Sequence, residues 1–594
     1  MRLALAAWRT AYLPETREAV RTAAAQSDQA AFTQPAQVRA LNAPYWLSSD
    51  GRIFTTVVRD KAVQWDVSRQ RQLREVALPG LSEGITDVSV DARWIAYRGR
   101  DGATVRNLAN GASHRIATGP WTDTDGAFGP SGRTFVVRRE GREAGAERAT
   151  VEVWDVRRER VLFRYPGGDP DGPLPVLSPN DRFLARCTHD GEQLRVWDVV
   201  ERRRVATDPP ARTQRLLCRS DQLTFTPDNR APAAGTTDGV VTWDFHADRA
   251  RPPLPMPGKG VNAVEFDPTG AYVLSWGSAG LALWRTDSPA PADGCPRRPV
   301  VTFRVETPAV TDIRLDPRQG VLRYREGSQA GVVRTLSLHG LISPAWRKKA
   351  RTEAAFDVDG RPAASAPRYG ARAVAADGTV HTAVNTRDGI RVTQQGPHPG
   401  SRTIGTRTED AIAIDPAGRT VVTAEGALID VGTGRRRRGF EGEDLLRTAV
   451  FSPDGRFLAA ADTQGRLTVW DAGGQHRIAV LAAADSTVER PALAFSADGS
   501  LLASSRADGS VRVWDTASPR LAGATLPTGG GPVLALGFTP GGGELRIATA
   551  HLPWRSAQLA PGRAADDVCA RAGGGATRTE WRRYLPDVPY RQTC

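Results

Sequence analysis

Lysine and long hydrophobic runs are both scarce in this chain of 594 residues. Lysine and arginine together number 79, yet the only lysines are Lys61, Lys259, Lys348 and Lys349, so arginine supplies almost all of the positive charge. No apolar run approaches the ~18 residues that a membrane-spanning helix requires. The start of the chain imitates a signal peptide only faintly, because Arg9 interrupts its apolar stretch and no cleavage pattern follows. We therefore expect a cytoplasmic protein with no membrane association.

Patterns typical of catalytic and metal sites are also missing. None of the eight histidines stands at metal-binding spacing, and no Gly-x-Ser-x-Gly nucleophile motif occurs. The segment Pro257–Gly260 contains the only Gly-Lys pair that resembles a phosphate-binding loop, and it lacks the spacing and the hydroxyl. These absences predict no catalytic residue, no metal ligand and no cofactor.

Cysteine is rare, and its spacing predicts little cross-linking. The five residues are Cys187, Cys218, Cys295, Cys569 and Cys594, and no two of them form a Cys-x-x-Cys pair. An odd number in a cytoplasmic protein is interpreted first as free thiols. A disulfide between Cys569 and Cys594, which flank one short terminal segment, is the alternative.

The chain does contain a sequence motif that repeats about every 44 residues, which is the spacing of Trp470 and Trp514. A copy begins with a turn such as Ser452–Gly455 and closes with an alternating apolar run that ends in Trp-Asp. Tryptophans from Trp154 to Trp284 follow one another at 43, 46 and 41 residues. Periods of this size predict a repeat architecture, and the Trp-Asp ending indicates β-propeller blades. The signature residues are Trp65, Asp66, Trp154, Asp155, Trp197, Asp198, Trp243, Asp244, Trp284, Trp470, Asp471, Trp514 and Asp515.

The turns give an independent count of the repeats. In the clearest copies Pro sets φ for the turn, and Asp-Gly or Asn occupies the positions that need positive φ. Most copies lie 37 to 49 residues apart, but the step from Phe356 to Ala375 is only 19, which predicts a shrunken blade or an inserted strand. The 13 turns begin near Ser48, Val90, Phe128, Leu177, Phe225, Phe266, Leu315, Phe356, Ala375, Ile414, Phe451, Phe495 and Phe538.

Over about residues 40 to 560 these features resemble the WD-repeat proteins. One propeller ring holds about 4 to 8 blades, so 13 turns require two rings. The resemblance implies an all-β fold of two WD-repeat β-propellers with about seven plus six blades, the first over residues 40–340 and the second over 341–562. The basic stretch 340–349 is the predicted border, with the loop 287–294 as the alternative. The Gly-His dipeptide that opens each repeat in this family is absent, so its histidine-based hydrogen-bond tetrad is not assumed.

Short helical segments are predicted at both ends, over residues 1–30 as a cap or linker and over 563–594 as a tail. In the tail, Thr577 and Glu580 form a capping box that starts a helix, and Trp581, Tyr584 and Leu585 are expected to dock that helix on a propeller.

The two ends also carry a second resemblance, through residues 3–20 and 568–594. They resemble the segments that flank the WD repeats of actinobacterial STAND-type signalling NTPases. The NTPase module of those proteins is absent from this sequence. The resemblance therefore implies the sensor half of such a system, without its catalytic part.

One arginine cluster follows the Trp197-Asp198 strand and another follows the Gly432–Gly434 turn, and they form a candidate rim for a partner. A solvated loop tip is one interpretation, and a basic surface for acidic proteins or nucleic acid is the other. No interleaved aromatic residues suggest base stacking, so an acidic protein is favoured over RNA. The clusters are Arg202, Arg203 and Arg204, and Arg435, Arg436, Arg437 and Arg438.

Taken together, these features predict a non-catalytic WD-repeat scaffold or sensor module that mediates protein–protein interaction in bacterial signalling. An enzyme with an axial propeller site is one alternative, because such a site is assembled from distant loops. A nucleic-acid binder that uses the arginine rim is the other.

Overall fold

The computed structural model divides the chain into two compact units. One is Asp28–His339, and the other combines Met1–Ser27 with Gly340–Cys594. The structure describes residues 1–25, 28–34, 44–99, 102–118, 124–143, 146–168, 174–188, 191–205, 207–219, 223–236, 239–247, 249–255, 261–277, 280–287, 299–303, 310–326, 332–347, 349–357, 360–363, 370–375, 377–406, 408–443, 445–481, 490–518, 522–572 and 574–594.

Seven four-stranded antiparallel sheets form the unit Asp28–His339, the first propeller. First strands of neighbouring sheets contact one another, β6 with β10, β14 with β18 and β2 with β26, so they surround the centre of a closed ring. The sheets are β2 Tyr45–Leu47, β3 Ile53–Val58, β4 Lys61–Asp66, β5 Arg71–Ala77; β6 Leu81–Val88, β7 Trp94–Gly99, β8 Gly102–Asn107, β9 Ser113–Thr118; β10 Thr124–Phe128, β11 Thr134–Glu143, β12 Ala146–Asp155, β13 Arg160–Gly168; β14 Val176–Leu177, β15 Phe183–Cys187, β16 Leu194–Asp198, β17 Arg203–Arg204; β18 Leu223–Phe225, β19 Pro232–Thr236, β20 Gly239–Asp244, β21 Arg249–Pro255; β22 Val261–Phe266, β23 Tyr272–Gly277, β24 Gly280–Arg285, β25 Val301–Phe303; and β26 Val310–Asp316, β27 Val321–Glu326, β28 Val332–Ser337 with β1 Asp28–Thr33.

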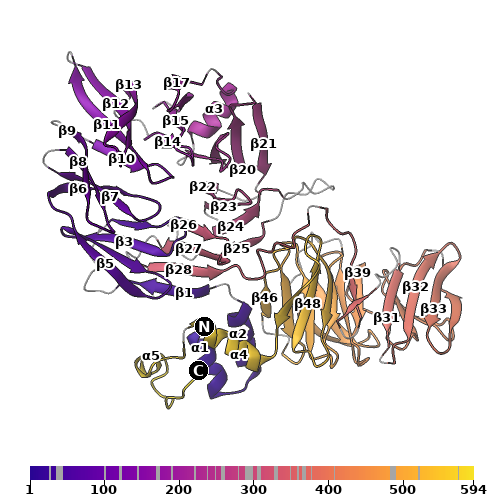
Figure 1. The fold of residues 1–594 in the computed structure, drawn as a ribbon. Coiled ribbons are helices and arrows are strands. Elements are labelled where there is room, and N and C mark those ends of the chain that lie inside the picture. The colour runs from indigo at the N-terminus through magenta and orange to yellow at the C-terminus, as the bar shows by residue number, and fades with distance from the viewer. Residues whose placement is uncertain are drawn as a thin grey trace. The chain divides into compact units, whose positions relative to one another are not determined.

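Strand β1 completes the last sheet of the first propeller from the other end of the sequence. It pairs antiparallel with β28, with Phe32 opposite Val333, and lies beside it in Figure 1. The Phe32 ring is 5.6 Å from that of Phe54 and 5.9 Å from that of Trp65, so it fills the core between the last and first sheets. Sequence analysis assigned residues up to 30 to the helical segment, whereas helix α2 ends at Ala25 and residues 28–33 belong to this sheet.

The second propeller follows in the other unit and is less regular. It has four four-stranded sheets, one of three strands and one of two. The two-stranded sheet, at the short step between Phe356 and Ala375, is the shrunken blade and packs against β47. The sheets are β29 Ala355–Phe356, β30 Pro362–Ala363; β31 Gly370–Val374, β32 Val380–Thr386, β33 Gly389–Gln395, β34 Gly400–Ile404; β35 Ala411–Ile414, β36 Thr420–Thr423, β37 Ala427–Asp430, β38 Arg436–Arg438; β39 Leu446–Phe451, β40 Phe457–Asp462, β41 Leu467–Asp471, β42 Arg477–Leu481; β43 Leu493–Phe495, β44 Leu501–Ser505, β45 Val511–Asp515, β46 Ala524–Leu526; and β47 Val533–Phe538, β48 Glu544–Thr549, β49 Arg555–Gln558.

Each of the 13 predicted turns joins the first and second strands of one sheet, which confirms the predicted fold of two WD-repeat propellers. The turn after β39 shows why. The Ser452 hydroxyl donates to Asp454 Oδ1 at 2.5 Å and accepts from the Phe457 amide at 2.9 Å, and Gly455 has φ of 71°. A side chain at that φ would be strained, so glycine suits the position.

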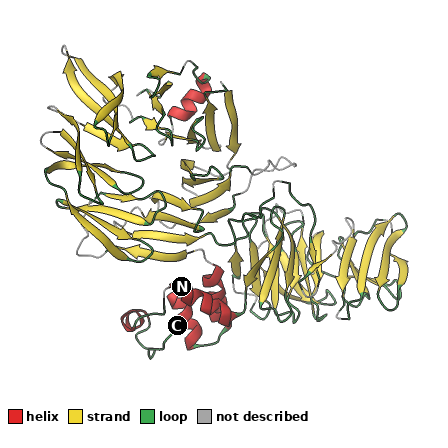
Figure 2. Ribbon diagram, in the orientation of Figure 1, coloured by secondary structure: helices red, strands yellow, loops and turns green. Residues whose placement is uncertain are grey.

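Helices gather where the two chain ends meet, in the unit of the second propeller (Figure 2). They are α1 Arg2–Thr10, α2 Pro14–Ala25, α4 Pro561–Ala572 and α5 Arg578–Tyr584, and their core includes fully buried Leu5, Val20 and Val568. The capping box of α5 is confirmed, since Thr577 Oγ1 accepts from the Glu580 amide at 3.2 Å and Glu580 Oε2 accepts from the Thr577 amide at 2.9 Å.

The docking expected for Trp581 is wrong. Its ring packs against Ala6 of α1 and Ala576, within the helical group, rather than on a propeller. Helix α1 offers Trp581 an apolar surface within the helical group. Because α1 lies at the opposite end of the sequence, this contact could not be predicted from residues near Trp581. Contact with the second propeller comes instead from α2, where the Glu18 carboxylate accepts from the Gly523 amide at 3.1 Å.

Candidate functional sites: arginine strands and an axial cavity

Every Trp-Asp signature residue lies at the end of the third strand of its sheet. The aspartates accept hydrogen bonds from backbone amides of the next turn, as when Asp198 Oδ1 accepts from Val200 and Glu201 at 3.0 Å. The same contact recurs at Asp66, Asp155, Asp244, Asp471 and Asp515. The signature aspartates therefore stabilise the turn that follows the third strand of their own sheet, and the signature residues are not arranged around a common centre.

The repeat that ends at Trp470 and Asp471 holds its tryptophan beside a group of charged side chains. Trp470 Nε1 donates to Thr468 Oγ1 at 2.9 Å, and Arg466 Nε donates to Asp462 Oδ2 at 2.7 Å. The Glu443 carboxylate lies 3.5 Å from Arg466 and is almost fully buried. Burial raises the pKa of Glu443, whereas Arg466 overcomes burial and lowers the pKa of Asp462. A partly exposed arginine thus lies against two buried carboxylates in this repeat.

The two predicted arginine clusters occupy equivalent places. Arg203 and Arg204 form β17, and residues 436–438 form β38. Both are fourth strands, farthest in the sheet order from the first strands that line the ring centre. Arg202 and Arg435 precede them in the turn, and all seven side chains are exposed.

Neighbouring acids distinguish the two clusters. In the first propeller, Arg203 pairs with Glu201 at 2.6 Å and Arg204 with Asp208 at 2.5 Å. In the second, Arg436 pairs with Glu409 at 3.2 Å. The other three, Arg435, Arg437 and Arg438, form no ion pair with any residue that the structure describes. Three of the four arginines of the β38 cluster, against Arg202 alone in the other cluster, therefore have no ion pair with a described acid, so more of the positive charge of the β38 cluster is available to a partner.

A cavity of about 730 Å³ lies inside the first propeller. Its wall includes first-strand residues Leu177, Phe225 and Phe266, which belong to three successive sheets. Turn residues Ser49 and Pro130 are exposed and mark the mouth. Because first strands surround the ring centre, the cavity is axial.

One ion pair stands on this largely apolar wall. Arg314 of β26 donates to Glu265 Oε2 of β22 at 2.8 Å and lies 3.9 Å from Asp312. Burial raises the pKa of Glu265, and the nearby Glu265 carboxylate raises the pKa of Arg314. Asp312 also pairs with Arg325 at 3.3 Å and has a left-handed φ of 52° at a β-bulge.

A further carboxyl, that of Asp87, lies near this ion pair. Asp87 of β6 accepts from the Phe128 amide at 2.7 Å and from the Val88 amide at 2.8 Å. Burial raises the pKa of Asp87 to about 6, and the negative charge of Asp312 adds to the rise. The site therefore combines three carboxyl groups with two guanidinium groups.

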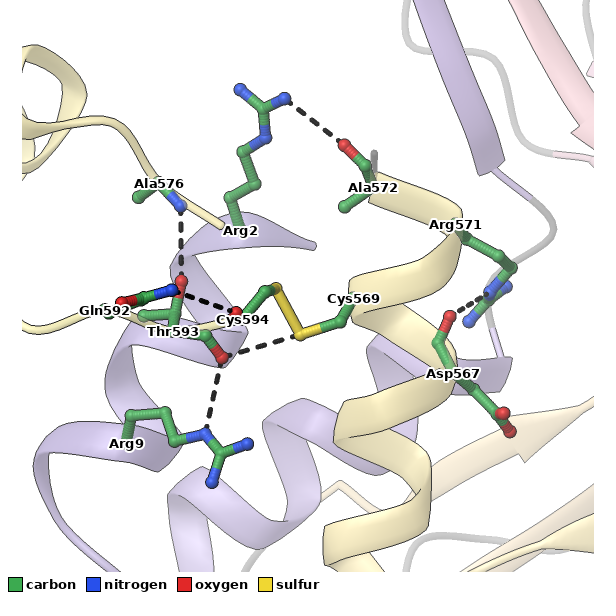
Figure 3. Close-up of a disulfide and its surroundings, with 10 residues drawn as sticks. All are labelled: Arg2, Arg9, Asp567, Cys569, Arg571, Ala572, Ala576, Gln592, Thr593 and Cys594. Atoms are coloured by element: carbon green, nitrogen blue, oxygen red, sulfur yellow. Dashed lines mark hydrogen bonds between the residues drawn. A yellow bond between two sulfur atoms is a disulfide. The ribbon is translucent and has the colours of Figure 1, made fainter. Parts of the chain in front are cut away.

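Two disulfides overturn the expectation of free thiols. Cys187 at the end of β15 is joined to Cys218 at the end of helix α3, Ala211–Cys218, and both residues line the axial cavity. Cys569 of α4 is joined to Cys594 at the C-terminus, where Thr593 also binds Arg9 and Ala576 (Figure 3). Cys295, like the loop 288–294, lies outside the described residues.

Within the described ranges there is no group of three or more His, Cys, Asp or Glu side chains that could hold a metal ion. None of the described helices has the length and hydrophobicity needed to cross a membrane.

Two stretches match the family model for the WD domain, G-beta repeat. They are residues 435–471 and 478–515. Each begins at the fourth strand of one sheet and continues through three strands of the next, so the repeat in sequence is offset from the blade in space. WD repeats generally mediate protein–protein interaction. No curated protein matches this chain significantly.

Sequence reasoning missed the axial site because its residues come from separate blades. A signal was present in the strands themselves. Glu265 stands in the otherwise mostly apolar first strand β22, and Arg314 stands in the first strand β26 beside Asp312. Charged side chains on the inner strands of a ring can point toward its channel.

Proposed function

We propose that this chain is a non-catalytic interaction module in bacterial signalling, and that it binds an acidic protein through the arginine strand β38. The observation that carries the proposal is the run of four exposed arginines, of which Arg436 alone pairs with a described acid. The run belongs to one of the two segments that match the WD repeat.

The strand holds its arginines in a fixed row. Residues Arg436, Arg437 and Arg438 pair with Ile429, Leu428 and Ala427 of β37, which are buried. Successive side chains of a strand point to opposite faces, about 3.3 Å apart along the chain. The guanidinium groups are thus presented on both faces of a supported edge strand, so less conformational entropy is lost when a partner binds.

Electrostatics favour an acidic partner. Exposed arginines without acids nearby create a positive potential that raises association rates with negative surfaces and weakens with salt. Guanidinium also forms two parallel hydrogen bonds with a carboxylate, which gives such a contact geometric specificity.

The test compares the full-length chain with two matched triple variants. One carries Arg435→Gln, Arg437→Gln and Arg438→Gln, and the other carries the equivalent set at Arg202, Arg203 and Arg204. Proteins cross-linked to each chain are quantified in untreated and in nuclease-treated lysate, with the cross-linking done at 50 and at 300 mM salt. We expect the wild type to capture acidic proteins at 50 mM salt and to lose them at 300 mM salt. The β38 variant should capture at least tenfold less of these proteins, whereas the β17 variant should capture as much as the wild type.

Equal capture by the wild type and the β38 variant would refute the proposal. Capture that disappears with nuclease treatment would indicate a nucleic-acid surface instead, and would equally overturn it. Circular dichroism of each variant checks that the propellers remain folded.

A further inference from the structure

The axial cavity of the first propeller has the size and the wall of a ligand site. Its volume of about 730 Å³ lies within the range of pockets that hold small molecules. Most of its wall is apolar, and the charged side chains on it are Glu265, Asp267 and Arg314. Asp267 is buried and satisfied within its own turn by the amides of Thr269 and Tyr272.

Glu265 retains an unused acceptor that faces the cavity. Its Oε2 accepts from Arg314, whereas its Oε1 accepts no hydrogen bond from any residue in the described part of the chain. The Glu265 side chain is 31% exposed, although it stands on a first strand at the ring centre. A carboxylate oxygen in a largely apolar cavity is costly to leave without a donor.

The charges around the cavity are unequal. Arg314 contacts Glu265 and lies 3.9 Å from Asp312, and it also donates to the Ile313 carbonyl at 2.9 Å. Asp312, Asp87 and Arg325 lie near this ion pair but are not among the residues that line the cavity. On the lining itself the two carboxyl groups of Glu265 and Asp267 stand against the single guanidinium group of Arg314, so negative groups are in excess when both carboxyls are ionised.

We propose that this cavity binds an organic monocation, an ammonium or guanidinium group carried on an apolar body. The cation is placed against Glu265 Oε1, and the body lies among Leu177, Phe225 and Phe266. A ligand anion fits less well, because the donors of Arg314 are directed at its own carboxylates and an anion would bury Glu265 against like charge. The proposal is independent of the arginine strand β38, which belongs to the other unit.

Calorimetric titration of the full chain with 4-phenylbutylamine tests the site. We expect saturable binding with one equivalent, at least tenfold weaker binding of 4-phenylbutanol, and no binding of 5-phenylpentanoate. The three probes share one apolar body, so their ranking isolates the charge. A preference for the alcohol or the acid, or no saturation by the amine at millimolar concentration, would overturn the proposal.

Three variants locate the binding. Glu265→Gln removes the carboxylate and is expected to weaken amine binding at least tenfold. Thr224→Phe fills the cavity without touching the ion pair, so it is expected to abolish binding even if Glu265→Gln is unstable. Glu75→Gln, on the outer strand β5 where Glu75 pairs with Lys61, is the matched control and should bind as the wild type does. Unchanged affinity in both cavity variants would refute the assignment.

A second probe distinguishes the two sources of such a cation. The capped tripeptide Phe-Arg-Phe presents a guanidinium group, the other monocation of the proposed class, on a peptide backbone with aromatic side chains. Binding of the peptide at least tenfold tighter than the amine would support a basic side chain of a partner protein as the ligand. The reverse order would support a small-molecule amine. Failure of both probes would overturn the proposal.

Discussion

Loss of the Cys187–Cys218 disulfide is expected to destabilise the first propeller substantially. The bridge joins residues 31 positions apart and ties the end of α3 to β15. In the chain-entropy model, closing a loop of that length lowers the entropy of the unfolded chain enough to stabilise the fold by about 3.5 to 4 kcal/mol. Cys187 is 5% exposed and belongs to a core between two sheets, so replacing it with alanine also removes buried contacts. The double variant Cys187→Ala/Cys218→Ala should therefore lose about 4 kcal/mol.

Hydrogen exchange followed by mass spectrometry measures this loss where it occurs. Because each 1.4 kcal/mol is a factor of ten, amides of β15 and β19 that exchange through unfolding of the propeller should exchange on the order of 500-fold faster. The pair Cys569→Ala/Cys594→Ala is the control, since its residues are 25 positions apart and lie in the other unit. That control should speed exchange in α4 and leave β15 unchanged.

Two results would refute this reasoning. Alkylation of denatured, unreduced protein should leave Cys187, Cys218, Cys569 and Cys594 unmodified, and their modification would show that the bridges do not form. Unchanged exchange in β15 and β19 of the double variant would show that the bridge does not contribute to the stability of the propeller.

Three further outcomes follow from single contacts. Burial raises the pKa of Asp87 from 3.8 to about 6, so the folded chain binds this proton more tightly than the unfolded chain does. The free energy of unfolding should therefore fall by up to about 3 kcal/mol as the pH rises from 4 to 6, and then level off. Denaturant unfolding at several pH values should show that fall, and Asp87→Asn should remove it. Thr577→Ala should lower the stability of α5 by about 1 kcal/mol because the capping box is lost. Thr579→Ala is the control and should leave the stability of α5 unchanged. Helicity measured during heating distinguishes the two variants. Asp181→Gly leaves a residue that tolerates the φ of 60° but removes the hydrogen bonds to Ser131 of the preceding sheet. The free energy of unfolding measured with denaturant should fall by about 2 kcal/mol. An unchanged free energy of unfolding would contradict this prediction.

Much of the blade structure could be predicted because its signals are local. The turn at Ser452–Gly455 is determined by a hydroxyl, a carboxylate and a glycine within a few residues. The capping box of Thr577 and Glu580 is equally local, and both predictions are confirmed. The short step after Phe356 likewise indicated an incomplete blade before its two strands were seen.

The candidate sites were predictable only in part. Sequence placed the two arginine clusters in equivalent hairpins, and the acids Glu201 and Asp208 stand beside the first cluster in the sequence itself. It could not show that Glu409, from an earlier part of the chain, would pair with Arg436. An axial site in a propeller was predicted only as an alternative, and no residue could be assigned to it. Its charged groups, such as Glu265 and Arg314, come from different blades.

By itself the sequence determined how many blades form and where each begins, because a turn and a buried strand depend on residues close to one another in the chain. Only the tertiary structure decided which distant residues meet. It brought β1 to β28, Cys187 to Cys218, and Trp581 to Ala6. Such contacts depend on how the ring closes and which apolar surfaces remain to be covered, and no local period carries that information.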